Sequence, residues 1–299
     1  MKMGKGIGIL ISERIALALV ADNAISGEVR VTPEDLTIAD SLHGVPAEMI
    51  VQRIAEQVKE LGLSEAPAYI GLGMPGIVRN GVIEDSPNLI QFKGINMQEL
   101  VAGVFAPTFG KIPVSVFNDA DVVAAGFAAT HGHLDRLIRV WTLGTGIGYG
   151  RYPFRDGFWE AGHSVVTLDP KEHFCGCGGR GHLEGIMGQR AMRLRFMDLE
   201  PEEVFEQAEA GDARCVEFTK LWHRALAAAT ATSIHLDGPG KFFITGFNSR
   251  FVNLSLLNEY LHEMVKLSPL QGYSTEVVTS AESVAVIGAA VNALQRAKG

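Results

Sequence analysis

The sequence predicts an α/β fold, because short apolar strands alternate with segments of helical periodicity along most of its length. Its 299 residues are enough for about two domains. Hydrophobic residues make up 47% of the chain and charged residues 20%, close to the averages of globular proteins, which excludes a disordered or fibrous chain. We therefore expect folded domains with substantial cores.

The N-terminal region begins with two expected strands, residues 7–11 and 15–20, joined by the polar turn Ser12-Glu13-Arg14. A helix is expected to begin at Pro46 and to end at Gly62, since apolar residues recur between them at helical spacing. These apolar residues are Ile50, Ile54, Val58 and Leu61.

A further strand over 69–72 runs into Gly73-Met74-Pro75-Gly76, whose glycines permit backbone angles that other residues resist. Such a loop is able to approach a ligand closely, but by itself it is weak support for a binding site.

Acidic residues stand where the next expected strand, 114–117, gives way to a helix over 122–130. The intervening residues are Asn118-Asp119-Ala120-Asp121. Asp119 is the best candidate for a general base, which would accept a proton from a substrate hydroxyl. The alternative is helix capping by Asn118, Asp119 and Asp121, and the residue types alone favour capping.

A glycine-rich turn follows the expected strand 139–143 and reads Gly144-Thr145-Gly146-Ile147-Gly148-Tyr149-Gly150. A strand, a glycine turn and a second strand form a pattern suited to binding an anion through backbone amides. The remaining elements alternate in the same way, and a domain boundary is expected near residue 116. They are helices around 184–198, 202–210, 214–236, 250–266 and 283–298, and a strand over 242–245.

The most specific chemical signal is a cluster of Cys and His residues, His163, Cys175, Cys177 and His182. Four such ligands would saturate a tetrahedral zinc ion and leave no open position, which indicates a structural zinc site. The spacing does not decide whether His182 or His173 is the fourth ligand. The competing interpretation is a glycine-rich turn with incidental cysteines.

Two glutamates flank this segment, Glu160 and Glu184. They are either acceptors for sugar hydroxyls or solvated surface carboxylates.

The net charge and the hydropathy of the chain limit the classes of partner that it is expected to bind. The net charge of −8 argues against nucleic acid as a partner, because binding the phosphate backbone needs a basic face. No apolar run reaches the length of a membrane span, and Glu13 and Arg14 interrupt the apolar stretch that a signal peptide would need. With only three cysteines, a cytoplasmic protein is expected.

Several of these motifs, in this order, resemble the ROK family of bacterial sugar kinases and repressors. Glu160-Ala161-Gly162-His163 is similar to the family's E-x-G-H, and the stretch from Cys175 to Glu184 is similar to its C-x-C-G-x-x-G-C-L-E. Further family segments match over about 70–290: Gly73-Met74-Pro75-Gly76, Ser86-Pro87-Asn88-Leu89, Asn118-Asp119-Ala120 and Leu143-Gly144-Thr145-Gly146-Ile147-Gly148.

The resemblance implies a two-domain actin-like ATPase fold with an interdomain cleft. The expected domains are residues 1–115, completed by the C-terminal helix at about 283–299, and residues 116–282, which carry the zinc segment 163–182. The family forms dimers or tetramers, so a homodimer or homotetramer is expected by analogy.

The resemblance also implies roles for individual residues. Asp119 would be the catalytic base, and the zinc would order the sugar site. The sugar hydroxyls would be held by Asn88, Asn118, Glu160, His163 and Glu184. The phosphates and the adenosine of ATP would meet Ser12, Gly144, Thr145, Gly146 and Gly246, with Mg²⁺ as a further cofactor.

Three departures from the family pattern are visible. His182 stands where the family has its third cysteine, a change that preserves a zinc ligand. The family's D-x-G-G-T phosphate loop is matched with residues 8–12, where only Ser12 is able to imitate the threonine. In the adenosine segment, Gly246 remains but is followed by the bulky Phe247.

The function expected from this resemblance is a carbohydrate kinase that transfers the γ-phosphoryl group of ATP to a hydroxyl of a hexose or hexose derivative. Because both weakened motifs lie on the nucleotide side, the alternative is a sugar-binding or sensor protein that does not phosphorylate its ligand. A DNA-binding repressor is the least favoured hypothesis, because family repressors carry a winged-helix segment before the first strand.

Overall fold

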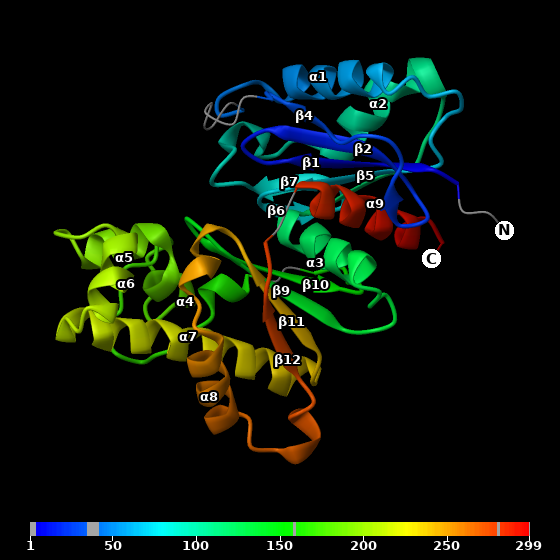
Figure 1. Ribbon diagram of the computed structural model, residues 1–299. Coiled ribbons are helices and arrows are strands. Elements are labelled where there is room, and N and C mark those ends of the chain that lie inside the picture. The colour runs from blue at the N-terminus through cyan, green and yellow to red at the C-terminus, as the bar shows by residue number, and fades with distance from the viewer. Residues whose placement is uncertain (1–3, 35–41, 158–159, 280–281, 299) are drawn as a thin grey trace. The chain divides into compact units, whose positions relative to one another are not determined.

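The computed structural model describes residues 4–34, 42–157, 160–279 and 282–298 (Figure 1). The chain forms two compact units. Unit 1 comprises Met1–Ile138, Gly150–Phe158 and Ser280–Gly299, and unit 2 comprises Arg139–Tyr149 and Trp159–Thr279. This division differs from the expected boundary at residue 116, because the strand that contains residue 116 pairs within the sheet of unit 1.

The sheet of unit 1 has the strand order β3-β2-β1-β5-β8, and β4 pairs with β2 beside this path. Strands β1 and β2 are antiparallel, whereas β1, β5 and β8 are mutually parallel. Their bounds are β1 Gly6–Ile11, β2 Ile15–Ala21, β3 Ala24–Ile25, β4 Arg30–Thr32, β5 Ile70–Met74 and β8 Val114–Asn118. The parallel register brings the carboxyl ends of β5 and β8 to one edge, where ligands bind in many α/β sheets.

Helices cover both faces of this sheet. α1 (Ala47–Glu60) and α2 (Met97–Phe109) lie over one face, and α3 (Asp119–Thr130) and α9 (Glu282–Lys298) lie over the other (Figure 1). The contact between α9 and β1 is very close, since a Cβ atom added at Gly8 would lie 1.9 Å from the Val286 carbonyl oxygen. Gly8 is therefore required by helix packing. A two-stranded ribbon of β6 (Ile77–Arg79) and β7 (Val82–Asp85) and the short helix η1 (Ile90–Phe92) complete the described elements of unit 1.

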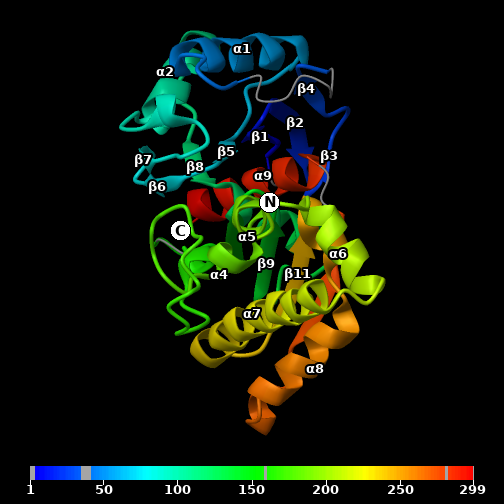
Figure 2. The same ribbon diagram turned by 90° about the vertical axis from the view of Figure 1, so that its left-hand side faces the viewer.

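The second sheet has the order β10-β9-β11-β12 and lies mostly in unit 2, although Ile138 of β9 and the part of β10 from Gly150 onward belong to unit 1. The long helix α7 lies against this sheet (Figure 2). Trp141 of β9 and Trp222 of α7 belong to the same buried cluster, and the Trp141 indole donates a hydrogen bond to the Thr230 hydroxyl at 3.0 Å. The strands are β9 Ile138–Leu143, β10 Ile147–Tyr152, β11 Lys241–Thr245 and β12 Ser274–Val277. The helices are η2 Ala161–His163, α4 Leu183–Met187, α5 Gln189–Arg195, α6 Pro201–Glu209, α7 Ala213–Asp237, η3 Phe247–Phe251, α8 Leu254–Met264 and η4 Ser268–Leu270.

Most of the expected elements are present. The short strands β3, β4, β6, β7 and β12 had not been expected, and three further differences concern helices. The helix expected from Val122 begins three residues earlier at Asp119, because Asn118 caps it. The single helix expected over 184–198 is broken at Gly188, whose extended backbone separates α4 from α5. Helix α2 had not been expected, although Asn96 caps it by accepting a hydrogen bond from the Glu99 amide.

No helix within the described residues has both the length and the apolar character to cross a membrane.

Candidate functional site

In unit 1, Asn118 and Asp119 occupy the junction between β8 and α3. Asn118 is the N-cap, and its side-chain oxygen accepts a hydrogen bond from the Ala120 amide at 2.9 Å. One carboxylate oxygen of Asp119 accepts a hydrogen bond from the same amide at 2.9 Å, and the Asp119 side chain is half-buried. Asn118 therefore performs the capping that the sequence had left open, while Asp119 is the first helical residue at the carboxyl edge of the sheet.

The loop after β5 is fastened beside this junction by two side chains. Asn118 donates through its side-chain nitrogen to the Gly76 carbonyl at 3.0 Å, and the Ser86 hydroxyl donates to the Pro75 carbonyl at 2.9 Å. Gly76 has a φ of 115°, a conformation that favours glycine. Asn88, the other expected sugar ligand of unit 1, is exposed between β7 and η1. The loop motif, Ser86 and Asn118 thus form one hydrogen-bonded framework next to Asp119.

Residues 8–12, which the sequence matched with D-x-G-G-T, lie mostly inside β1. Gly8 to Ile11 are buried residues inside β1, and only Ser12 lies in the turn between β1 and β2. This turn is Ser12-Glu13-Arg14, in which the Ser12 amide donates to the Arg14 carbonyl at 3.0 Å. The Arg14 guanidinium pairs with Glu282 at the start of α9, so the positive charge in the turn already has a carboxylate partner.

In unit 2, the turn between β9 and β10 is formed by Gly144, Thr145 and Gly146. The Gly144 amide donates to the Gly146 carbonyl at 3.0 Å, and the side chain of Thr145 is exposed. The Gly144 carbonyl accepts hydrogen bonds from the Gln189 amide at 3.2 Å and from the side-chain nitrogen of Asn248 at 3.1 Å. The helix α5 and the residues after β11 therefore hold this turn in place.

Gly246 and Asn248 belong to the segment that follows β11. Gly246 has a φ of 94°, and a Cβ atom there would lie 2.5 Å from the Leu143 carbonyl oxygen. Asn248 is fully buried, whereas Phe247 between them is exposed and has the Arg250 guanidinium 4.0 Å from its ring centroid. Gly246 thus lies close to the end of β9, directly before the Gly144 turn.

Four ligand atoms of the Cys and His segment converge in unit 2. His163, Cys175, Cys177 and His182 each offer one ligand atom, and these atoms lie within 4.8 Å of one another. The Cys175 sulfur is 3.4 Å from Nδ1 of His163 and 3.4 Å from the Cys177 sulfur, and the Cys177 sulfur is 3.3 Å from Nδ1 of His182. His173 lies outside this group, and its ring faces the Lys171 carbonyl and stacks on Phe174.

The three distances between neighbouring ligand atoms fit zinc. A tetrahedral ion with ligand bonds of about 2.0 to 2.3 Å holds its ligand atoms about 3.3 to 3.8 Å apart. Burial raises the pKa of the Cys175 thiol, and the neighbouring Cys177 and Glu184 contribute to the rise. A cation bound between the sulfurs would reverse this effect, because a coordinating thiol is deprotonated.

The backbone around the cluster is compact. Antiparallel hydrogen bonds join residues 164–166 to 181–183, and a Cβ atom at Gly179 would lie 1.9 Å from the His182 ring. His182 directly precedes α4, so the fourth ligand atom is positioned by the start of that helix.

Glu160 and Glu184 adjoin the cluster from opposite sides of the sequence segment. Nε2 of His163 is 3.9 Å from a Glu160 carboxylate oxygen, while Nδ1 of the same ring faces Cys175. Glu184 accepts a hydrogen bond from the Ile147 amide at 3.0 Å, and its other oxygen is 3.7 Å from the Cys175 sulfur. Glu184 therefore connects the Cys and His segment with the Gly144 turn.

Comparison with known proteins identifies the family. The sequence profile of the ROK family matches residues 14–296. A glucokinase of Thermotoga maritima is 30% identical to this chain, and the match covers 81% of this chain and 84% of the glucokinase. The chain belongs to the ROK family.

Other ROK proteins match as well, and their names differ. An N-acetylmannosamine kinase of Haemophilus influenzae is 27% identical over 74% of this chain and 76% of that kinase. A xylose repressor of Caldicellulosiruptor bescii is 31% identical over 73% of this chain, and the match spans 60% of that repressor.

A solved structure, the ROK hexokinase of Thermus thermophilus, has the same fold. Its TM-score with this chain is 0.78 at 23% identity, and the match covers 98% of this chain and 99% of the hexokinase. The chain thus has the actin-like ATPase fold of the ROK proteins, as its sequence predicted.

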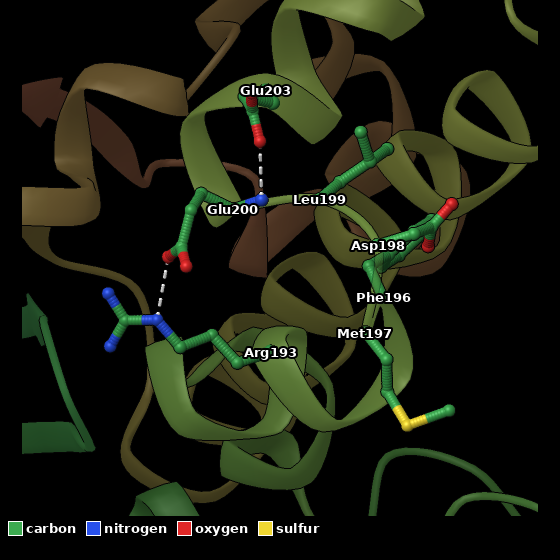
Figure 3. A pocket seen from close by; sticks show the side chains of 7 residues that line it. All are labelled: Arg193, Phe196, Met197, Asp198, Leu199, Glu200 and Glu203. Carbon is green, nitrogen blue, oxygen red and sulfur yellow. Dashed lines mark hydrogen bonds and ion pairs between the residues drawn. The ribbon is translucent and has the colours of Figure 1, made fainter.

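A hollow elsewhere in unit 2 contains none of the expected ROK site residues. It has a volume of about 250 Å³ and lies around the loop between α5 and α6 (Figure 3). Arg193 donates to the Glu200 carboxylate at 2.8 Å, and the Glu203 carboxylate accepts from the Glu200 amide at 2.7 Å (Figure 3). These bonds connect α5 to the start of α6, which indicates that Arg193, Glu200 and Glu203 have a structural role.

Sequence reasoning missed Gln189 and Asn248 as supports of the Gly144 turn. Asn248 stands two residues after Gly246 in the weakened adenosine segment, so its position in a known ROK segment was the available signal. The Gln189 contact is made by a backbone amide, which leaves no mark in the residue type.

Proposed function

We propose that this ROK protein is an ATP-dependent sugar kinase that phosphorylates a hydroxyl of a hexose or hexose derivative. The observation that carries the proposal is the position of Asp119, which stands at the carboxyl edge of the parallel strands as the first residue of α3, with Asn118 as the N-cap. The names of the glucokinase and the N-acetylmannosamine kinase support the reaction class.

In the proposed reaction, a sugar hydroxyl oxygen forms a bond to the γ-phosphorus of ATP. The bond from that phosphorus to the β,γ-bridging oxygen breaks, and ADP leaves with the electron pair. Asp119 accepts the hydroxyl proton, which yields the sugar phosphate and ADP. Bound Mg²⁺ supplies neutralisation of phosphate charge in such reactions.

The sugar hydroxyls are assigned to five side chains, Asn88, Asn118, Glu160, His163 and Glu184. The contacts of His163 support its assignment as a sugar ligand, since Nδ1 faces the Cys175 sulfur and Nε2 faces Glu160. With Nδ1 on a metal, the tautomer of the ring is fixed, and Nε2 carries a proton for a hydroxyl or a carboxylate.

A structural zinc is proposed at His163, Cys175, Cys177 and His182. When bound, it supplies a fixed geometry and positive charge for the segment that carries Glu160 and Glu184. The phosphates are assigned to Gly144, Thr145 and Gly146 and to Ser12, and the adenosine side to Gly246. A cytoplasmic location and a homodimer or homotetramer remain predictions.

A second candidate is a sugar-binding or sensor protein that does not phosphorylate its ligand. The turn Ser12-Glu13-Arg14 favours it, since Glu13 brings negative charge to a turn assigned to phosphate and Arg14 already pairs with Glu282. A DNA-binding role is disfavoured by the net charge of −8.

The deciding experiment measures ADP release with ATP, Mg²⁺ and a panel of hexoses and N-acetylhexosamines, together with sugar binding by calorimetry. We expect turnover with at least one sugar, and Asp119→Asn to lower kcat by about 10³-fold while the sugar Kd changes by less than about tenfold. The control is Asp135→Asn, an exposed carboxylate of the same unit.

Measurable sugar binding without ADP release for any sugar would establish the sensor function instead. Full turnover in Asp119→Asn would show that Asp119 is not the base.

A further inference from the structure

Asp121 is a buried carboxyl group that the proposed reaction does not use. It lies in the first turn of α3, two residues after Asp119, and is only 5% exposed. A carboxylate rarely occupies such a position without a partner or a function, because burial penalises its charged form. The neighbours of Asp121 are therefore informative.

Two buried residues of unit 1 hold this turn of α3. One oxygen of the Asp121 carboxyl accepts a hydrogen bond from the backbone amide of Arg151 in β10 at 3.0 Å. The Asn292 side chain, on α9, donates to the backbone carbonyl of Asp121 at 3.4 Å. The start of α3 is thus joined to β10 and to α9 through Asp121, and through these contacts the position of Asp119 is fixed as well.

Few charged side chains occur on the elements that pack against the start of α3, where Asp121 lies. Strands β5 and β8 contain no acidic or basic side chain, and the charged residues of α9 lie at its two ends, at Glu282, Arg296 and Lys298. The groups that act on the Asp121 carboxyl are Asp119 in its own turn and Arg151 of β10.

The pKa of Asp121 is raised to about 7, chiefly by burial and also by the negative charge of Asp119, while the Arg151 amide and guanidinium oppose the rise. An asparagine would keep an oxygen for the Arg151 amide without any burial penalty on a charge. The carboxyl group thus costs stability at a place where its charge reaches Asp119, which is typical of functional positions.

We propose that Asp121 is a positioning residue for Asp119: its carboxyl anchors the first turn of α3 to β10, and its negative charge strengthens Asp119 as a proton acceptor. This inference rests on the proposed function, because it assumes that Asp119 accepts the proton of the sugar hydroxyl. The electrostatic influence is mutual, since the charge of Asp119 acts on Asp121 in the same way.

The test compares Asp121→Asn with Asp121→Ala and the wild-type protein. The asparagine retains the hydrogen bond from the Arg151 amide and removes the charge, whereas the alanine removes both. We expect kcat of the wild-type protein to rise through an ionisation near pH 7. In Asp121→Asn this ionisation disappears from the kcat profile and the sugar KM stays within about twofold, and Asp121→Ala loses at least about tenfold in kcat at every pH. Asp135→Asn, which also removes one negative charge, should follow the wild-type profile.

A second measurement does not depend on turnover. A carboxyl whose pKa is raised by folding stabilises the protein at low pH, and that stabilisation is lost as the pH rises through about 7. The Tm of Asp121→Asn should therefore exceed that of the wild-type protein by several degrees at pH 8, with a smaller difference at pH 5.

Superimposable kcat profiles for Asp121→Asn and the wild-type protein would overturn this inference alone, and so would equal Tm values at pH 8. Absence of turnover in the wild-type protein would overturn the proposed function, and this inference with it.

Discussion

Two turns, one in each unit, have the same backbone pattern and different side chains. In Ser12-Glu13-Arg14, between β1 and β2, the first amide donates to the third carbonyl at 3.0 Å. In Gly144-Thr145-Gly146, between β9 and β10, the corresponding amide and carbonyl are also 3.0 Å apart. Both turns span three residues between neighbouring strands of a sheet.

The side chains give the two turns different chemistry. The glycine turn has no side chain at its first and third positions, and Gln189, Asn248 and Glu184 hold it from outside. The other turn carries a carboxylate at Glu13 and an arginine that pairs with Glu282. The two turns therefore share a backbone pattern, while only the glycine turn has the residue types that the proposed function assigns to phosphate binding.

The largest expected effect is that of Gly146→Ala. The added Cβ atom would lie 2.6 Å from a Glu184 carboxylate oxygen, which displaces Glu184 from the Ile147 amide and shifts the turn. We expect kcat/KM for ATP to fall by about 10² to 10³-fold, measured by ADP release, because phosphoryl transfer depends on positioned donors. Gly103→Ala is the matched control, since nothing lies near the added atom there. Unchanged kinetics would show that this turn does not serve the nucleotide.

The next largest effect is expected on the zinc content and the sugar affinity of Cys177→Ser. Cys177→Ser removes one sulfur of the cluster, so we expect zinc, measured by atomic emission on the purified protein, to fall from about one ion per chain to less than about a tenth. The sugar Kd should rise by about 10 to 100-fold, because His163 and Glu160 lose their fixed positions. Cys215→Ala, at a buried cysteine outside the cluster, should retain the ion. A wild-type protein purified without zinc would contradict the assignment.

A smaller effect is expected from Glu13→Gln, which removes the negative charge from the first turn and keeps the side-chain size. The KM for ATP should decrease by about threefold at low salt and by less at high salt, since exposed charges are screened. Glu28→Gln, an exposed carboxylate outside the turn, is the control. A KM that does not change would show that the first turn lies outside the nucleotide site.

The smallest expected effect concerns the pH dependence of stability, which a buried histidine of unit 2 and the buried Asp121 of unit 1 influence differently. His223 of α7 is fully buried, with Nδ1 on the Thr219 carbonyl and Nε2 accepting from the Asn253 amide, and burial lowers its pKa. A histidine with a lowered pKa stabilises the fold above the pKa of the unfolded chain, and this stabilisation is lost as the pH falls below about 6.5. The stability contributed by His223 therefore increases with pH, whereas the stability contributed by Asp121 decreases with pH.

We therefore expect the Tm of His223→Gln to vary less between pH 7 and pH 5 than that of the wild-type protein, as measured by calorimetry. His235→Gln, at an exposed histidine of the same helix, should keep the wild-type slope. The reverse order of the two slopes would contradict the role of burial.

The sequence predicted the fold class and most elements, because strands and helices here carry clear apolar periodicity. It also singled out the four residues of the Cys and His cluster, since soft ligands within a short window are rare. Spacing did not choose between His173 and His182; the choice in the structure depends on the hydrogen bonds that bring residues 181–183 beside 164–166.

Three features lay beyond sequence reasoning for physical reasons. Gly8 lies inside β1 and serves the packing of α9, a contact between the two ends of the chain. Gln189 acts through its backbone amide. Asp121 was interpreted only as a capping residue, because its burial and its bond to Arg151 arise from tertiary packing.

The long sequence separation between α9 and its partners matters during synthesis. Strands β1 and β5 leave the ribosome early, whereas the helix that covers Gly8 and Gly71 is translated more than two hundred residues later. Until that helix emerges, an apolar sheet face stays open to chaperones and to aggregation, while most of unit 2 is already available to fold. Chains truncated by a stop codon before residue 282 should therefore fail to fold in unit 1 first.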